Sequence, residues 1–421
     1  MKRELLQPDI VDVHLQSADA DRHVRVGKLA HRHARGHTTL SFSYTSEWLN
    51  SRRSFMLDPR LELYAGEQYA AGAQGNFGIF LDSAPDRWGR MLLDRREAEA
   101  ARSEHRAARA LTEWDYLLGV QDECRMGALR FRHDAASPFL DNQPLPVPPV
   151  TSLPELESIS LALEQDHAED LPNYRQWLLT LIAPGTSLGG SRPKANFLEK
   201  DGSLWIAKFP SREDRRDIGA WEKLLLDLAA SCGIVVSEHS RHRFHGKHHT
   251  FCTKRFDRHG PGRSFFVSAM TLLERRDGDG GSYLDLAEFI QTHGVRGHIE
   301  ADLEQLFRRV IFNVLVGNTD DHLRNHGFIH ENEGWRLAPA YDLNPNPAKR
   351  AHALRIDEST TAPDIDVVMA TASLYRLPTP KAAKLLEAVR SKTRKWKELA
   401  RNAQLSSTEI ASSEAAFALS A

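Results

Sequence analysis

The chain has 421 residues, in which 55 Lys and Arg nearly balance 57 Asp and Glu. One hydrophobic core rarely serves a chain of this length, so two or three packed subdomains are expected. The near-zero net charge excludes a protein that grips nucleic acid through its overall field. Three scattered cysteines exclude a disulfide framework and a CxxC metal site.

The residue pattern contains neither a signal peptide nor a membrane-spanning segment. The basic start of the chain is not followed by a continuous apolar segment of the signal-peptide kind. No later apolar run approaches the ~18 residues that a membrane span needs. We therefore expect no membrane association and a cytoplasmic location, where the cysteines stay reduced.

The first part of the chain changes from strand-like to helix-like patterning. The segments VDVHL, VRVGKLA and TLSFSY alternate apolar and polar residues, which predicts a small sheet. From about Asp82 to Val120, apolar residues recur at three- and four-residue spacing, which predicts helices. After the strand-like GALRFRH, the prolines of DNQPLPVPPVTSLPELE predict a surface linker, and we place a first subdomain at 1–150.

A glycine-rich run, PGTSLGGSRPK, opens the second part and precedes a predicted hairpin, ANFLEK and SLWIAKFP joined by a DG turn. A helix is expected from about Arg212 to Cys232, with Gly233 ending it. The strand-like FCTKRFD and FFVSAMTLL follow, and from Ser282 the chain is mostly helical, with a hairpin in GFIHENEGWRLA. We expect a nucleotide-binding part at 151–256 and a helical catalytic lobe at 257–421.

Three histidines cluster in RHRFHGKHHTF, namely His245, His248 and His249. The Gly-Lys turn between two short alternating runs predicts a hairpin tip with exposed imidazoles. A zinc site is disfavoured because no cysteine or carboxylate supports the histidines.

A burst of polar residues, NTDDHLRNHGFI, follows the apolar helix that ends in IFNVLVG. Asp320 and Asn325 are five residues apart, the spacing of the kinase pattern HRDxxxxN, and Asp342 follows in APAYDLNP after the predicted hairpin. Phosphoryl transfer needs a carboxylate to deprotonate the acceptor hydroxyl, and an amide and a carboxylate oxygen on Mg²⁺. A polar turn that merely ends a helix would explain one aspartate, not this series.

The upstream region offers the phosphate-binding half of such a site. Gly189 and Gly190 let backbone N–H groups approach phosphate oxygens of ATP. Lys208 lies in the alternating run SLWIAKFP, as the strand lysine of a protein kinase does, and Glu222 in the next helix can pair with it. Each signal is weak alone, and their order along the chain gives them weight.

These segments together resemble the HipA-like kinases, the toxin components of bacterial toxin–antitoxin pairs. The resemblance implies an α+β, two-lobed atypical protein-kinase-like fold with an extra N-terminal α/β subdomain and a mostly helical C-terminal lobe. It also implies a serine/threonine kinase activity that uses ATP and Mg²⁺. The motifs that carry it are VGKLA, SFSYTSEWL, APDRWGR, MGALRF, SLGGSRPK, WIAKFP, TKRFDR, VSAMTLLE, SYLDLAEFI, NTDDHLRNHGFI and APAYDLNP.

Individual roles are implied by the same resemblance. Asp320 matches the catalytic aspartate, with the adjacent Asp321 as its rival, and only the five-residue spacing favours Asp320. The remaining matches are Asn325 and Asp342 for Mg²⁺, Lys208 for the ATP phosphates, Lys254 and Phe256 at the hinge that meets adenine, and Tyr341 beside the base.

Family members autophosphorylate a serine in the glycine-rich loop and thereby silence themselves. The matching position is Ser187, with Thr186 and Ser191 as neighbouring alternatives. A phosphate on a loop that cradles ATP opposes binding by like-charge repulsion.

The implied partners are a protein substrate, which in some members is an aminoacyl-tRNA synthetase, and a HipB-like helix-turn-helix antitoxin. DNA would be reached only through that antitoxin. Two other functions stay open: a small-molecule phosphotransferase, because such enzymes share the Asp–x₄–Asn loop, and a catalytically idle partner of the antitoxin that acts in repression. Retention of Asp320, Asn325, Asp342 and Lys208 speaks against the idle partner.

Overall fold

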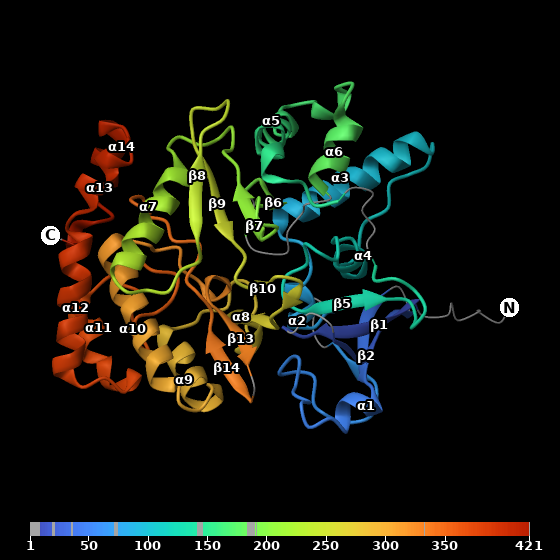
Figure 1. Cartoon of the computed structure of the whole chain (residues 1–421), viewed down its shortest axis with the longest axis horizontal. Coiled ribbons are helices and arrows are strands. Elements are labelled where there is room, and N and C mark those ends of the chain that lie inside the picture. Colours follow the sequence, from blue (N-terminus) through green and yellow to red (C-terminus); the bar gives the residue numbers. More distant parts are fainter. Residues whose placement is uncertain are drawn as a thin grey trace. The chain divides into compact units, whose positions relative to one another are not determined.

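The structure is a computed structural model that describes residues 9–18, 22–34, 37–70, 75–140, 146–182, 190, 192–331 and 333–420. Its contacts divide the chain into two compact units, Met1–Trp205 with Asp257–Val267, and Ile206–Phe256 with Ser268–Ala421 (Figure 1). The expected subdivision at residues 150 and 256 stays a prediction.

The first unit contains a five-stranded antiparallel sheet in the order β4-β3-β2-β1-β5. The three strands predicted from alternation are confirmed as β1, β2 and β3, and GALRFRH contains β5. Gly27 is required in β2 because a Cβ there would lie 2.1 Å from the ring of Phe42. The strands are β1 (Asp9–Gln16), β2 (His23–Ala34), β3 (His37–Tyr44), β4 (Gln68–Tyr69) and β5 (Leu129–Arg132).

Helices in the first unit follow the predicted apolar periodicity between residues 82 and 120, with a loop between α3 and α4. Two further helices, α5 and α6, were not predicted. Helix α5 begins at Leu153, within the proline-rich segment, so the prediction of a surface linker is wrong for the last residues of that segment. The first unit also contains β6 (Lys194–Leu198), β10 (Arg258–His259) and β11 (Gly262–Arg263). Its helices are α1 (Ser46–Leu49), α2 (Gly78–Asp82), α3 (Arg87–Ser103), α4 (Glu113–Leu118), α5 (Leu153–Leu163) and α6 (Tyr174–Ile182).

Asp86 begins α3 and also forms a buried ion pair. Its carboxylate accepts the N–H of Gly89 at 2.8 Å, which is an N-cap. The other oxygen lies 2.6 Å from Nζ of Lys194, and both side chains are at most 3% exposed. Lys194 is the first residue of β6, directly after the glycine-rich run, so the pair fastens that strand to α3.

In a second sheet, β7 (Leu204–Lys208), β9 (Thr250–Lys254) and β8 (His239–His242) follow one another, and β7 belongs to the second unit from Ile206 onward. The chain passes from β7 to β8 through α7 (Ile218–Ser231), which ends before Gly233 as predicted, with a φ of +77° at that glycine. The helix begins at Ile218 and not near Arg212, because Asp217 accepts the N–H of Ala220 and caps it there.

The histidine-rich segment does join two antiparallel strands, β8 and β9, as predicted. The expectation of exposed imidazoles holds for His245 but is wrong for His248 and His249, which are each 9% exposed. For His249 the reason is Asp217, whose carboxylate contacts Nδ1 of that residue at 2.5 Å and also accepts its backbone N–H. A buried carboxylate at a helix start draws this part of the loop inward.

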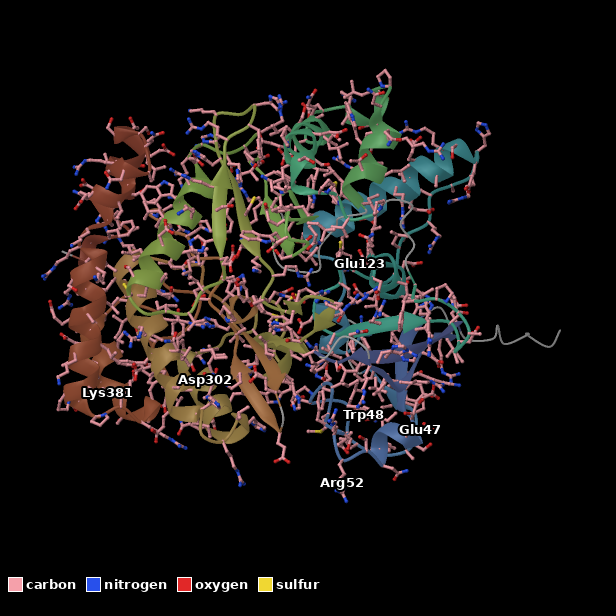
Figure 2. The ribbon with its side chains drawn as sticks, in the orientation of Figure 1. Glu47, Trp48, Arg52, Glu123, Asp302 and Lys381 are labelled. Atoms are coloured by element: carbon pink, nitrogen blue, oxygen red, sulfur yellow. The ribbon has the colours of Figure 1, made fainter. Side chains whose placement is uncertain are left out.

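The rest of the second unit is mostly helical, as predicted, with the antiparallel hairpin of β13 and β14 in the expected place. Asp302 of α10 accepts hydrogen bonds from Arg336 of β14, and Lys381 of α12 lies 2.7 Å from Glu304 (Figure 2). No helix among the described residues has the length and apolar character to cross a membrane. The elements are α8 (Ala269–Leu272), α9 (Tyr283–His293), α10 (Ile299–Val316), β13 (Gly327–Glu331), β14 (Gly334–Leu337), α11 (Ile365–Ala370), α12 (Thr379–Thr393), α13 (Trp396–Asn402) and α14 (Ser407–Ser413), while β12 (Phe266–Ser268) crosses the unit boundary.

Candidate functional site

The predicted catalytic loop begins where the long helix α10 ends. Gly317 ends the helix with a left-handed φ of +61°, and a Cβ there would lie 2.5 Å from the carbonyl oxygen of Ala416. Asn318 then turns back onto the last turns of α10, where its side chain donates to the amide oxygen of Asn313 at 3.1 Å. The polar burst seen in the sequence is therefore fixed to a buried helix.

Asp320 lies on the surface of this loop. Its side chain is 61% exposed, and it accepts hydrogen bonds from the side-chain amide of Asn346 and, at 3.1 Å, from Nζ of Lys349. An exposed carboxylate can meet the hydroxyl group of an incoming acceptor, so this position suits the role that the sequence predicts.

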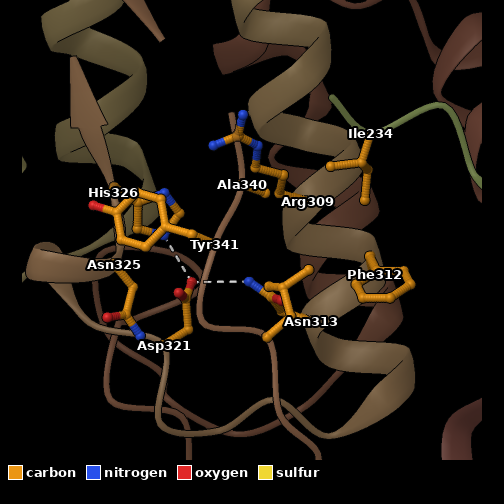
Figure 3. A pocket seen from close by; sticks show the side chains of 10 residues that line it. Ile234, Arg309, Phe312, Asn313, Asp321, Asn325, His326, Ala340 and Tyr341 are labelled. Atoms are coloured by element: carbon orange, nitrogen blue, oxygen red, sulfur yellow. Dashed lines mark hydrogen bonds and ion pairs between the residues drawn. The ribbon is translucent and has the colours of Figure 1, made fainter. Parts of the chain in front are cut away.

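Asp321, the rival candidate, is buried to 2% exposure. One of its oxygens accepts from Asn313 Nδ2 at 2.8 Å and from the His326 ring at 2.7 Å (Figure 3). The same oxygen accepts from Tyr283 Oη at 2.7 Å. Burial acts to raise the pKa of Asp321, but His326 and the hydrogen bonds outweigh it and lower the pKa. Asp321 is thus an ionised structural anchor and is not open to an acceptor.

Asn325 and the residues on both sides of Asp342 line one small cavity of about 10 Å³. The close-up view shows Asn325 and Tyr341 facing it, together with Asp321 (Figure 3). Asn325 ends a short 3₁₀ turn, Leu323–Asn325, and is 8% exposed. The cavity therefore places Asn325 close to Tyr341 and Leu343, the chain neighbours of Asp342.

Asp342, Lys208 and Glu222 form a three-residue ion cluster. Nζ of Lys208 lies 2.6 Å from Glu222 of α7 and 2.7 Å from Asp342. Burial acts to lower the pKa of Lys208, but the charges of Asp342 and Glu222 outweigh it and raise that pKa. The lysine therefore stays cationic at the end of β7.

The backbone at Asp342 is unusual because its φ of +59° lies in the left-handed region. Non-glycine residues are uncommon there, although aspartate tolerates the region better than most. Such positions persist where the surroundings hold them, and they gather at functional sites. At Asp342 the contact with Lys208 supplies part of that hold.

The two aromatic residues that the resemblance places near the base lie against each other. The rings of Phe256 and Tyr341 stack with centroids 5.8 Å apart, and Tyr341 donates its hydroxyl to the carbonyl of Arg324 at 2.8 Å. The backbone N–H of Lys254 donates to Glu238 O, and its side chain contacts the Glu238 carboxylate at 3.3 Å.

The donor set agrees with the ion that kinases use. An amide oxygen and a carboxylate oxygen are hard ligands of the kind that Mg²⁺ prefers, and Asp342 is 43% exposed. Across the part of the chain that the structure describes, no group of three or more His, Cys, Asp and Glu residues could hold a metal ion. A magnesium ion would therefore need oxygens from a bound nucleotide or water to complete its shell.

Part of the predicted phosphate loop lies outside the described residues, namely Gly189, Ser187, Thr186 and Ser191. Gly190 is described and has a left-handed φ of +92°. Its carbonyl accepts from Nζ of Lys194 at 3.3 Å.

Sequence reasoning missed the support beneath the catalytic loop. Tyr283, Asn313 and His326 were not singled out, although Asp321 next to Asp320 hinted at a second carboxylate with another task. Asn346 and Lys349 were also missed. They follow Asp342 closely, and the polar run NPNPAKR was the available signal.

Comparison with known proteins identifies a family and several relatives whose sequences are similar to that of this chain. The family of the HipA-like C-terminal domain matches residues 186–397. A Haemophilus influenzae protein named "Putative kinase" is 30% identical over 200 residues, which cover 41% of this chain and 57% of that protein. The serine/threonine-protein kinase toxin HipA of Shewanella oneidensis is 27% identical over 188 residues, or 38% of this chain and 43% of the toxin.

The fold is shared with a solved structure. The complex of Shewanella oneidensis HipA, HipB and operator DNA contains a chain that matches with a TM-score of 0.63 and 18% identity, covering 97% of this chain and 96% of that one. This likeness confirms the predicted α+β, kinase-like architecture. The sequence matches span less than two thirds of the curated relatives' own lengths. Because the family match covers half of the residues, this chain belongs to the HipA-like family.

Proposed function

We propose that this chain is an ATP- and Mg²⁺-dependent serine/threonine protein kinase. The observation that carries the proposal is the ion cluster in which Lys208 contacts both Glu222 and Asp342. A strand lysine held by a helix glutamate, next to a metal-binding aspartate, is the arrangement that kinases use to hold ATP phosphates. The kinase names of the sequence relatives add support.

The residues divide the work as follows. Asp320 accepts the proton of the acceptor hydroxyl, and its exposure supports that role. Lys208 holds ATP phosphates together with the backbone at Gly189 and Gly190. Asn325 and Asp342 would hold Mg²⁺, which would supply the positive charge that neutralises the phosphates. The adenine base would meet Lys254, Phe256 and Tyr341.

The acceptor is proposed to be a protein, such as an aminoacyl-tRNA synthetase or another translation enzyme. A HipB-like antitoxin is the proposed regulatory partner, with DNA bound through that antitoxin. The support is that a solved chain of the same fold occurs in a complex of HipA, HipB and operator DNA.

Autophosphorylation at Ser187 is the proposed off-switch. A phosphate adds close to two negative charges to a loop that has to approach the phosphates of ATP, so binding is expected to weaken. Thr186 and Ser191 are the neighbouring sites that the same logic allows.

The test is incubation of the purified full chain with Mg²⁺ and ATP, followed by mass spectrometry of the phosphopeptides. Phosphate is expected on Ser187 in the wild type. The variant Asp320→Ala is expected to lose it, by roughly 10³-fold or more in rate, because the acceptor loses its base and orienting group.

Glu300→Ala is the matched control, since Glu300 is an exposed carboxylate at the start of α10, outside the proposed site. It should keep full activity. A wild-type chain that neither carries phosphate nor turns over ATP would contradict the kinase proposal. Phosphorylation of a small cationic molecule but of no protein would favour a small-molecule phosphotransferase instead.

A further inference from the structure

The cationic side chain of Lys349 approaches the proposed catalytic carboxylate, Asp320. Nζ of Lys349 lies 3.1 Å from one oxygen of Asp320, and the other oxygen accepts from the amide of Asn346. Lys349 is 47% exposed, so its ammonium faces solvent on the same side as Asp320. The roles proposed above use neither residue.

The position of Lys349 is set by the backbone on both sides of it. The N–H of Asn346 donates to the carbonyl of Gly317 at 2.9 Å, and the N–H of Ala353 donates to the carbonyl of Thr319 at 2.9 Å. Thr319 immediately precedes Asp320, and Gly317 lies three residues before it. The segment 346–353 therefore forms a loop pinned at both ends to the catalytic loop, and Lys349 lies between the pins.

Two further contacts stiffen this segment. The amide oxygen of Asn346 accepts the N–H of Ala348 at 3.1 Å, which is a local turn of the kind that asparagine favours. The guanidinium of Arg216 donates to the carbonyl of Pro345. Its Nη1 atom is buried without a hydrogen-bond partner among the described residues. A second positive charge thus lies beside the loop.

We propose that Lys349 is a further catalytic residue, which holds the phosphoryl group as it moves from ATP to the acceptor. The inference rests on the kinase function proposed above. In that reaction the acceptor oxygen forms a bond to the γ-phosphorus, the bond from that phosphorus to the β-bridging oxygen breaks, and the hydroxyl proton passes to Asp320.

The negative charge in this reaction is spread over the equatorial oxygens of the moving group. A fixed cation beside the base meets that charge, whereas it makes no contact with the part of the nucleotide that remains as ADP. Lys349 keeps its contact with Asp320 and turns its remaining N–H donors to the phosphoryl oxygens, since an ammonium has three donors.

The experiment measures binding as well as turnover in the purified full chain. Titration calorimetry with Mg²⁺ gives the Kd of ADP and of the non-hydrolysable β,γ-imido-ATP, and steady-state assays give kcat. Lys349→Ala should weaken β,γ-imido-ATP about tenfold, leave ADP unchanged, and lower kcat about tenfold to a hundredfold, as expected for one lost charge-assisted hydrogen bond. Lys349→Arg should recover part of both losses.

Arg350→Ala is the matched control, because Arg350 is the adjacent exposed cation, and it should change none of these quantities. Equal weakening of ADP and β,γ-imido-ATP in Lys349→Ala would assign Lys349 a structural role and overturn the inference. Unchanged binding and kcat would overturn it as well. A wild-type chain that binds neither nucleotide would overturn the kinase function itself, which is a distinct result.

Discussion

Adjacent aspartates in this chain have opposite environments. Asp320 is exposed, and Asp321 is buried beneath it with three donors. The five-residue spacing to Asn325 favoured Asp320. The burial of Asp321 was not predictable, because its donor Tyr283 lies 38 residues away in the sequence, although Asn313 is close along the chain. A local pattern predicts which aspartate meets the acceptor, while the burial of its neighbour depends in part on a residue that is distant in the sequence.

His14 shows how one buried residue makes stability depend on pH. Its side chain is 1% exposed, its Nε2 accepts from Arg132 at 2.8 Å, and its ring packs edge-on against Phe139. Burial, followed by the charge of Arg132, lowers the pKa of His14 to about 3. The folded chain therefore keeps this ring neutral at pH values where the unfolded chain protonates it.

The sign of the effect follows from linkage. Because the pKa falls from 6.5 to about 3 on folding, the stabilising contribution is complete above pH 6.5 and is lost as the pH drops from 6.5 towards 3. At pH 5 the loss is about 2 kcal/mol. Urea unfolding at pH 7.5 and pH 5 should show a smaller difference for His14→Gln, which keeps an acceptor for Arg132. An equal pH dependence in both proteins would contradict this account.

Among the elements, α3 depends on a single residue at its start. Asp86 caps the helix and is also the ion-pair partner of the buried Lys194. Asp86→Ala is expected to lower the free energy of unfolding by about 3–5 kcal/mol, because it leaves a buried ammonium without its carboxylate. Urea denaturation followed by circular dichroism measures the loss.

The double variant Asp86→Ala with Lys194→Met should recover most of that stability, since no buried charge then remains. The half-exposed pair Arg90–Glu113 provides a control, and Glu113→Ala should cost only about 1 kcal/mol or less. If Asp86→Ala and Glu113→Ala cost the same, the buried pair has no special weight.

Element by element, periodicity predicted what depends on a local face of the chain. The alternating segments became β1, β2 and β3, and the apolar helix before the polar burst became α10. The start of α7 was placed too early because Asp217 competes for it, a choice that apolar spacing does not show. Helix α5 was hidden by Pro154 and by the prolines that precede it, although Pro154 lies in the first turn, where proline is tolerated.

For the molecule as a whole, the family match at residues 186–397 leaves most of the first unit outside it. The three residues of the ion cluster, Lys208, Glu222 and Asp342, and the proposed metal ligand Asn325 all lie in the second unit. The fold was predictable because the motifs along the chain resemble those of a known family. The protein acceptor was not predictable, because the residues that bind ATP do not specify which hydroxyl group receives the phosphate.

The acceptor is open to a cellular test. Phosphoproteomes of cells that express the wild type or Asp320→Ala should differ by phosphorylation of a translation enzyme, at about tenfold or greater enrichment if the transfer is direct. Expression of Glu300→Ala should reproduce the wild-type pattern. A set of phosphorylated proteins without any translation enzyme would refute the proposed target class.

The left-handed backbone at Asp342 also has an evolutionary consequence. Glycine adopts a φ of +59° without the steric cost that any other residue bears, and codons for aspartate and glycine differ by one nucleotide. Asp342→Gly thus removes the proposed metal ligand while it relieves backbone strain. Relief of that strain offsets part of the cost of losing the contact with Lys208, so an inactive protein is a single mutational step away.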